Sequence, residues 1–198
     1  MLQGTLFCKF AVQFQLMLFN LFGKKEGSDD NHIFTDRAYM TTAAKIKACT
    51  ELARKDPNHI FICWFPDTAE KFKGAFRAEG LDENLITDTH HLHSSKILNK
   101  IPVFTEHYPL HSKELDLIKN WGPEKIVVYS AMDEPLFKHF GSEKLLPLMK
   151  MMGMKENEVI EHNMVTKSII KGQEKIAEQV NLEQSASSQA GWMEKNLK

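Results

Sequence analysis

The strongest constraint on the fold is an apolar run, HIFICWF at residues 59–65, that is followed closely by a helical pattern. A continuous apolar run of this length is typical of a strand buried on both faces of a parallel sheet. The helix that follows, residues 69–79, ends before Gly80, a common helix terminator. Further strands are predicted at 84–89, 101–105 and 125–130. Because strands alternate with helices, we predict an α/β fold, a mostly parallel sheet of about four strands with helices on both faces.

Helices are also predicted on either side of these strands. Residues 41–55 carry apolar side chains at helical spacing and end before a proline. Residues 142–153 and a segment beginning near residue 163 form two amphipathic helices. In the loop between them, Val159 and Ile160 are the apolar residues expected to reach the core.

The chain divides into four parts on composition. The tail after residue 182 is polar and predicted to be disordered, although Trp192 and Met193 are available to dock on a partner. The predicted parts are an apolar extension and polar linker over 1–31, an α/β domain over 32–141, a helical C-terminal appendage over 142–182 and a disordered tail over 183–198.

The N-terminal residues 1–22 are apolar and contain one charged residue, Lys9. They lack the basic start and small-residue cleavage site of a signal peptide, and polar residues interrupt the length that a membrane span needs. Two interpretations stay open: an extension that precedes a natural start at Met17, or a segment that contacts a membrane surface. In the second case Lys24 and Lys25 favour anionic lipid.

The overall charge argues against a nucleic-acid-binding protein. The formal net charge is −1, whereas domains that grip phosphates are usually strongly basic. The chain has three cysteines, at positions 8, 49 and 63, without metal-ligand spacing. We therefore expect no disulfide framework, and a reducing cytoplasm fits best.

Polar residues at the ends of the predicted strands are the candidates for a ligand pocket. Ligands of open parallel sheets bind beyond the carboxyl ends of the strands. These residue types also cap helices, and we favour capping over catalysis for them. The candidate pocket residues are Asp67, Thr68, Thr89, Thr105 and His107.

Other chemistry finds less support in the sequence. Five histidines, at positions 90, 91, 93, 107 and 111, are a tempting zinc or copper set, but no cysteine or carboxylate falls at a familiar ligand spacing. Cys63 lies inside an apolar strand, which disfavours the thiolate that a nucleophile needs. No glycine-rich phosphate-binding loop occurs. We predict no metal and no cofactor.

The C-terminal helices carry a family resemblance. FGSEKLLPLMKMMGMKENEVIEHNMVTKSIIKGQEKI, residues 140–176, resembles a segment of SecA, the motor ATPase of bacterial preprotein translocation. In that family a Phe-Gly-Ser-Glu opening, a Gly-Met helix end and an Ile-Glu-His segment come in this order, where the second motor domain passes into the helical scaffold. The preceding AAKIKACTELARKDPNHIFICWFPDTAEKFKGAFRAEGL, residues 43–81, looks like the first elements of that helicase-like second motor domain.

The resemblance also implies what this chain lacks. IPVFTEHY stands where the family has a Gly-Arg-Gly-Thr-Asp-type motif, and only Thr105 is kept. The arginine-rich segment is absent between Asp116 and Lys125, and the first motor domain with its Walker A loop has no counterpart. Helicase-like ATPases need both sets of phosphate contacts, so the resemblance implies a pseudo-ATPase that hydrolyses no ATP.

The functional expectation is a SecA-like, catalytically degenerate module that binds a protein partner, such as a translocase component. Its expected location is cytoplasmic, with peripheral contact at the inner membrane face as an alternative. The other open readings are a small-molecule or nucleotide-binding α/β enzyme that uses strand-end carboxylates and histidines, and a relic without function. The candidate partner-binding residues of the appendage, which also suit its own core, are Leu145, Met149, Met152 and Ile169.

Overall fold

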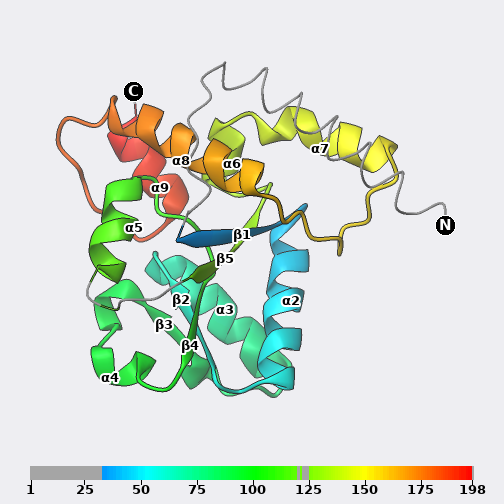
Figure 1. The fold of residues 1–198 in the computed structure, drawn as a ribbon, viewed down its shortest axis with the longest axis vertical. Helices are drawn as coiled ribbons and strands as arrows, with labels where there is room; N and C mark the ends of the chain where they lie inside the picture. The colour runs from blue at the N-terminus through cyan, green and yellow to red at the C-terminus, as the bar shows by residue number, and fades with distance from the viewer. Residues whose placement is uncertain (1–32, 120, 122–124, 198) are drawn as a thin grey trace.

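The chain folds around one five-stranded parallel sheet (Figure 1) in a computed structural model that describes residues 33–119, 121 and 125–197. The strand order is β1-β5-β4-β2-β3, and all neighbouring strands are parallel. The predicted α/β class is therefore confirmed, with one strand more than expected. The strands are β1 (Phe34–Tyr39), β2 (His59–Cys63), β3 (Ile86–Asp88), β4 (Ile101–Phe104) and β5 (Ile126–Ala131).

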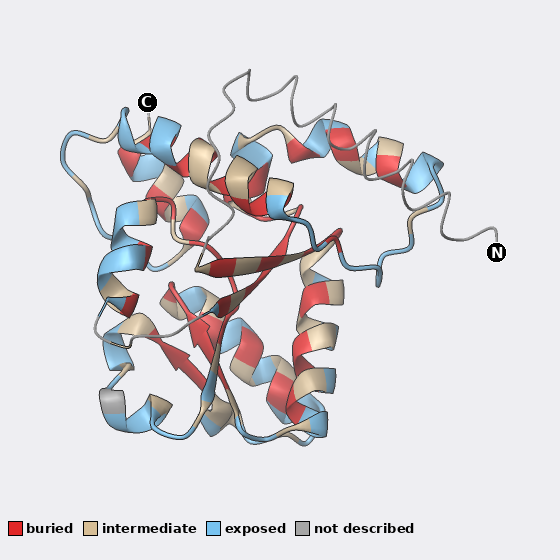
Figure 2. Cartoon of the chain, in the orientation of Figure 1, coloured by how far each residue is buried: buried red, intermediate tan, exposed pale blue. Residues whose placement is uncertain are grey.

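Helices cover both faces of this sheet. One apolar cluster joins one face to α2 and α3, and a second joins the other face to α5, α6, α8 and α9. Figure 2 shows the buried residues concentrated in the strands and on the helix sides that face them. The α-helices are α2 (Thr42–Lys55), α3 (Pro66–Ala78), α4 (Ser94–Ile97), α5 (His111–Ile118), α6 (Pro135–His139), α7 (Ser142–Met151), α8 (Asn163–Ala177) and α9 (Gln189–Asn196).

Strand β1 is the element that the sequence did not predict. Its segment FTDRAY has no apolar run, and charged residues occupy its centre. Phe34, Asp36 and Ala38 are buried while Thr35 and Arg37 between them are partly exposed, so the strand does alternate. A carboxylate occupies one of the buried positions, and this hides the apolar alternation by which a half-buried strand is recognised.

Helix α2 forms where it was predicted, for local reasons that the sequence shows. The Thr41 hydroxyl accepts a hydrogen bond from the backbone N–H of Ala44 and caps the helix, and Arg54 and Lys55 lie in its last turn. Its buried face contains Cys49 and Ala53, spaced four residues apart as one side of a helix requires. Lys45 occupies the preceding position of the same buried row.

The appendage formed by α7 and α8 packs against the edge of the sheet at β1. Its apolar side chains share one cluster with Ala38, Met132 and Phe137. Ile160, in the loop between the helices, exchanges backbone hydrogen bonds with Ala38 and pairs antiparallel with it. Ile160 is therefore buried as predicted, whereas Val159 is 37% exposed, contrary to expectation.

The tail after residue 182 differs from the disordered segment that its polar composition predicts. Residues 189–196 form helix α9, whose first turn is capped by the Ser188 hydroxyl. Trp192 is fully buried, and Gln189 and Asn196 are buried with it. One large buried aromatic side chain, together with the hydrogen-bonded amides of Gln189 and Asn196, is enough to dock the segment, although the composition of the segment is polar.

The N-terminal extension predicted over residues 1–31 lies outside the described residues. Within the part of the chain that the structure describes, no helix is long and apolar enough to cross a membrane.

Helices α6 and α8 approach each other closely at Gly172. A Cβ atom at this position would lie 2.4 Å from Cζ of Phe140. We expect Gly172→Ala to lower the free energy of unfolding by about 1–3 kcal/mol, because the ring must move within a packed site. Gly74 of α3 is the matched control, since a Cβ there meets nothing within 4 Å. Gly74→Ala should be neutral or stabilising by up to about 1 kcal/mol in the same urea titration, and equal effects would contradict the expectation.

Candidate functional site

The connections of the sheet change direction between β2 and β4. The chain leaves β2 through α3 toward β3, and it leaves β4 through α5 toward β5 on the opposite side. Open parallel sheets bind ligands in the crevice outside the strand ends at such a switch point. A ligand site is therefore expected at the residues that follow β2 and β4.

A carboxyl group of the chain itself, from Glu106, occupies the place of this crevice. Glu106, which follows β4, is 3% exposed, and its Oε1 accepts hydrogen bonds from the backbone N–H groups of Trp64 and Phe65 at 3.0 and 3.2 Å. Its Oε2 accepts from the Thr68 hydroxyl at 2.9 Å. Burial raises the pKa of Glu106 to about 7, against the opposing effect of Lys45. The donors at the entry to α3 are thus occupied by an internal carboxyl group.

A buried cation lies next to this carboxylate. Lys45 of α2 is 1% exposed, and its Nζ donates to Glu134 Oε1 and to the backbone carbonyl of Thr105. Burial opposes the charged form of Lys45, but Glu134 and Glu106 raise its pKa above the usual value. Burial raises the pKa of Glu134, whose Oε2 has no hydrogen-bond partner among the described residues. Lys45 therefore joins α2 to the ends of β4 and β5.

A second charged network surrounds His107. Nε2 of His107 lies 2.5 Å from Asp36 Oδ1, and Nδ1 lies 2.9 Å from Glu114 Oε1. Burial opposes the imidazolium, but the carboxylates of Glu114 and Asp36 raise the pKa of His107 well above its ordinary value. With two carboxylates as acceptors, both ring nitrogens donate. Burial alone would raise the pKa of Glu114, but His107 and the other donors lower it to about 2.

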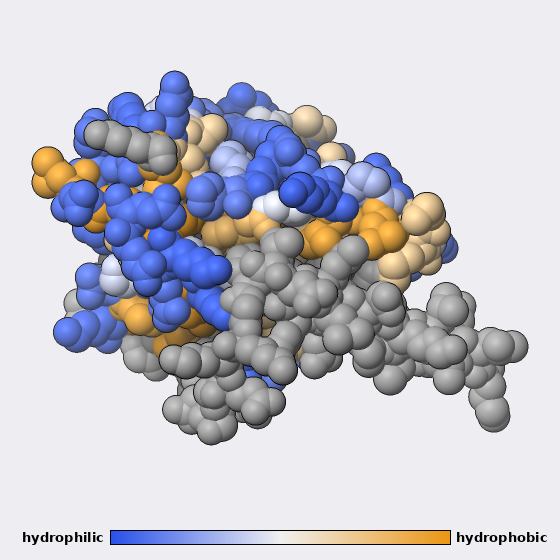
Figure 3. All heavy atoms as spheres, turned by 90° about the horizontal axis from the view of Figure 1, so that it is seen from above, coloured by the Kyte–Doolittle hydropathy of each residue, from blue (hydrophilic) through white to orange (hydrophobic). Residues whose placement is uncertain are grey.

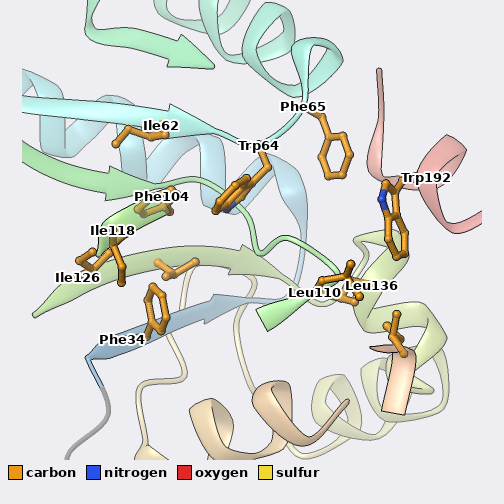
Figure 4. Packing of buried hydrophobic residues seen from close by; sticks show 12 residues of the cluster. Phe34, Ile62, Trp64, Phe65, Phe104, Leu110, Ile118, Ile126, Leu136 and Trp192 are labelled. Carbon is orange, nitrogen blue, oxygen red and sulfur yellow. The ribbon is translucent and has the colours of Figure 1, made fainter. Parts of the chain in front are cut away.

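The C-terminal segment covers the crevice from outside. Figure 4 shows Trp192 beyond the end of β2, close to Phe65 and Leu136. The Trp192 and Tyr108 rings meet edge to face, with centroids 5.8 Å apart. The Gln189 amide accepts from the backbone N–H of Leu136 and donates to the carbonyl of His107. This end of the sheet is therefore closed by side chains of the same chain.

The structure brings together three of the five predicted pocket residues. The Thr68 hydroxyl donates a hydrogen bond to Glu106. Thr105 and His107 are the residues directly before and after Glu106 in the chain. Asp67 is exposed and bonded to Ser187, so it does not cap α3. Thr89 donates to the Trp64 carbonyl at 3.4 Å. That these five residues form a ligand pocket stays a prediction.

Sequence reasoning missed the charged residues on which this end of the sheet depends. For Lys45 a signal exists, because it occupies an apolar row with Cys49 and Ala53, where a charged residue implies a buried partner. For Asp36 and Glu114 no comparable signal exists. Their partner His107 lies far from Asp36 in the sequence and across a turn from Glu114.

The predicted partner-binding residues divide into two groups. Leu145, Met149 and Ile169 are at most 4% exposed and pack in the appendage core. Met152 is 38% exposed and lies beside Met151, which is 80% exposed. Only Met152 of these four is available at the surface in this conformation.

The remaining sequence candidates are also placed by the structure. His90, His91 and His93 are exposed, and His91 Nδ1 contacts the Asp88 carboxylate at 2.8 Å. Cys63 is fully buried, and burial raises its pKa, which suppresses the reactive thiolate.

An open groove lies along the edge strand β3. Its volume is about 790 Å³, and it runs between α3 and α4. None of the five predicted pocket residues lines it. Its walls carry both positive and negative side chains: Lys73 pairs with Glu70, and Arg77 pairs with Glu83. The groove is therefore a separate feature from the closed crevice.

Comparison with known proteins gives a local match. No protein-family model matches the chain. Among curated proteins, it is 52% identical over 48 residues to protein translocase subunit SecA of Acidithiobacillus ferrooxidans, covering 24% of this chain and 5% of that protein. It is 40% identical over 57 residues to SecA 1 of Chlorobium chlorochromatii and 39% identical over 57 residues to SecA of Chlorobaculum tepidum, each covering 29% of this chain and 6% of the relative. The matches span a small fraction of the relatives' length, and they show that this chain contains a SecA-related region.

Proposed function

We propose that this protein is a catalytically degenerate, SecA-like accessory factor that binds a protein partner in preprotein translocation. The observation that carries the proposal is the closed crevice at the ends of β2 and β4. Glu106 occupies the hydrogen-bond donors there. A nucleotide phosphate would have to displace the Glu106 side chain, whose oxygens already accept the hydrogen bonds of these donors.

The surface proposed for the partner is the tip of the appendage, formed by Met151, Met152 and Val159. These side chains are 80%, 38% and 37% exposed, although each is apolar. Figure 3, which looks down on the appendage, shows apolar atoms in orange tones at its right-hand end. Methionine adapts to irregular partner surfaces, so exposed methionines suit a protein-binding role.

The test of this role is capture of a translocase partner from a bacterial lysate by the intact protein. We expect Met151→Glu combined with Met152→Glu to reduce capture at least about tenfold, because two buried apolar contacts would be replaced by charges. Leu98→Glu is the matched control, since Leu98 is 71% exposed near α4, away from the appendage (Figure 1). Equal capture by both variants, or turnover of ATP above background, would contradict the proposal.

The groove beside β3 favours one second candidate, a small-molecule-binding α/β enzyme. Its volume of about 790 Å³ suits a metabolite, and Asp88 and His91 line it. A thermal-shift screen with nucleotides and metabolites separates the two candidates. A ligand at a hundred times its Kd stabilises a protein by about 2.7 kcal/mol, which such a screen detects.

A further inference from the structure

We propose that residues 183–197 form a reversible plug, which undocks from the crevice while the sheet stays folded. The undocked state exposes a surface that binds a helix with an aromatic anchor. This inference concerns the crevice rather than the appendage tip, and it does not depend on the proposed role in translocation.

The plug holds its own shape through internal hydrogen bonds. The Asn196 amide accepts from the backbone N–H of Gln184 at 2.7 Å and donates to the Gln184 carbonyl at 2.8 Å. Trp192 Nε1 donates to Glu183 at 3.0 Å, and Lys195 Nζ donates to the Ser185 carbonyl at 3.0 Å. These bonds close the segment on itself, so it resembles a cooperative unit that can leave as a whole.

The polar contacts that attach the plug to the rest of the chain come from Gln189, Ser187 and Glu183, and the last of these also pairs with Lys113 at 3.3 Å. Gln189 bridges Leu136 N–H and the His107 carbonyl at 2.8 and 2.9 Å. Ser187 accepts from the backbone N–H of Asp67 at 3.0 Å, and Glu183 accepts from the Tyr108 hydroxyl. Trp192 is the single large apolar side chain of the plug that is fully buried. Its burial, together with that of the partly buried Ala186, Met193 and Leu197 in the same cluster, must offset the conformational entropy of the ordered segment.

The connection from α8 to the plug leaves room for movement. Helix α8 ends at Ala177, and neither helix nor strand forms again before Gln189. Asn181 is exposed in this stretch, and Leu182 is 82% exposed. A surface tether of this kind permits a docked segment to open without disturbing the elements that it joins.

The uncovered crevice would present aromatic and polar groups with a definite pattern. Tyr108 lies between Phe65 and Trp64, with ring centroids 5.5 and 5.0 Å from them. Leu136 N–H and the His107 carbonyl lose their partners when Gln189 leaves. The occupant that satisfies these groups is a helix bearing an aromatic residue three positions after an amide side chain, as in α9 itself.

Native-state hydrogen exchange of the wild-type chain tests the undocking step. We expect amide protons of residues 189–197 to exchange at least about tenfold faster than those of β2, β4 and β5. A disulfide in the variant Asp67→Cys, Ser187→Cys, whose native side-chain oxygens are 3.2 Å apart, should slow this exchange toward that of the sheet. Reduction of the disulfide supplies the control. Equal exchange in plug and sheet of the wild type would overturn the proposal.

Binding in trans tests the exposed surface. The probe is a labelled peptide with the sequence of residues 183–198, added to the full-length Trp192→Ala variant and to the wild type. We expect saturable binding to the variant, at least about tenfold weaker binding to the wild type, and none by a peptide with Gln189→Ala and Trp192→Ala. Collapse of the variant's cooperative unfolding would overturn the proposal, because it would make Trp192 an integral part of the core. Absence of peptide binding to a folded variant would overturn it as well.

Discussion

Replacing Lys45 with methionine should lower the free energy of unfolding by about 3–5 kcal/mol, measured by urea denaturation at pH 7. Lys45 is 1% exposed and donates to Oε1 of Glu134, whose Oε2 has no hydrogen-bond partner among the described residues. Without the ammonium group, Glu134 and Glu106 stay buried without the cation that most favours their charged forms. Breaking a buried ion pair from one side costs the desolvation of the partner that remains.

A matched control is available on the same helix. Lys47 has a side chain that is 71% exposed and lies 4.0 Å from Glu51. We expect Lys47→Met to change stability by less than about 0.5 kcal/mol. Adding Glu134→Gln to Lys45→Met should recover part of the loss, because the unpaired charge is then removed as well. A loss below about 1 kcal/mol for Lys45→Met would contradict the buried ion pair.

Replacing His107 with phenylalanine should have a similarly large effect, about 3–5 kcal/mol. The imidazolium lies between Asp36 and Glu114, and all three side chains are at most 2% exposed. His91→Phe is the control, because the His91 side chain is 76% exposed beside Asp88 and should contribute at most about 1 kcal/mol. Comparable losses in both variants would show that the buried network contributes little.

The same network predicts an unusual dependence of stability on pH. The folded pKa of His107 is raised above 6.5, so its contribution is complete below about pH 6.5 and is lost as the pH rises through the folded value. Glu114, with a folded pKa of about 2, contributes fully above its ordinary value of 4.5 and loses this contribution as the pH falls toward 2. Glu106, with a folded pKa of about 7, binds its proton more tightly when folded, so stability falls as the pH rises from about 4.5 to 7.

Taken together, these three groups place the maximum of stability on the acidic side of neutrality, between about pH 4.5 and 6.5. Urea midpoints measured from pH 4 to 10 check this expectation. In His107→Phe the decline above pH 6.5 should flatten, while the decline that Glu106 causes below pH 7 should persist. A wild-type maximum above pH 8 would contradict the assignment.

The parts of the fold that the sequence predicted are those with local signals. The apolar run at β2 and the caps and apolar rows of α2 depend on neighbouring residues, and both elements were found where expected. Strand β1 and helix α9 depend on distant partners instead. Asp36 is buried because His107 lies across the sheet, and Trp192 is buried because the ends of β2 and β4 offer a crevice. Composition alone reports neither relationship.

The candidate site also combines features that have a local sequence signal with features that depend on distant residues. The rule that parallel sheets bind ligands at their strand ends pointed to Thr68, Thr105 and His107, which lie around or next to Glu106, but their role as a ligand pocket stays a prediction. It could not indicate that Glu106 would occupy the backbone donors itself, since that depends on the path of the chain after β4. The capping role suggested for Asp67 is wrong, because α3 begins with Pro66 and its N-cap residue, Phe65, makes no side-chain cap.

The position of Asp36 has a consequence for how the sheet assembles. Strand β1 pairs with β5 in a parallel register that sets Asp36 opposite Val128. A slip of one residue would turn Asp36 outward and bring Thr35 or Arg37 to the buried face, so His107 would lose an acceptor. Alternative alignments of β1 are thereby penalised. Asp36 therefore favours the observed register over its one-residue shifts, and we expect Asp36→Val to increase heterogeneity of strand pairing more than it changes the strength of the correct pairing.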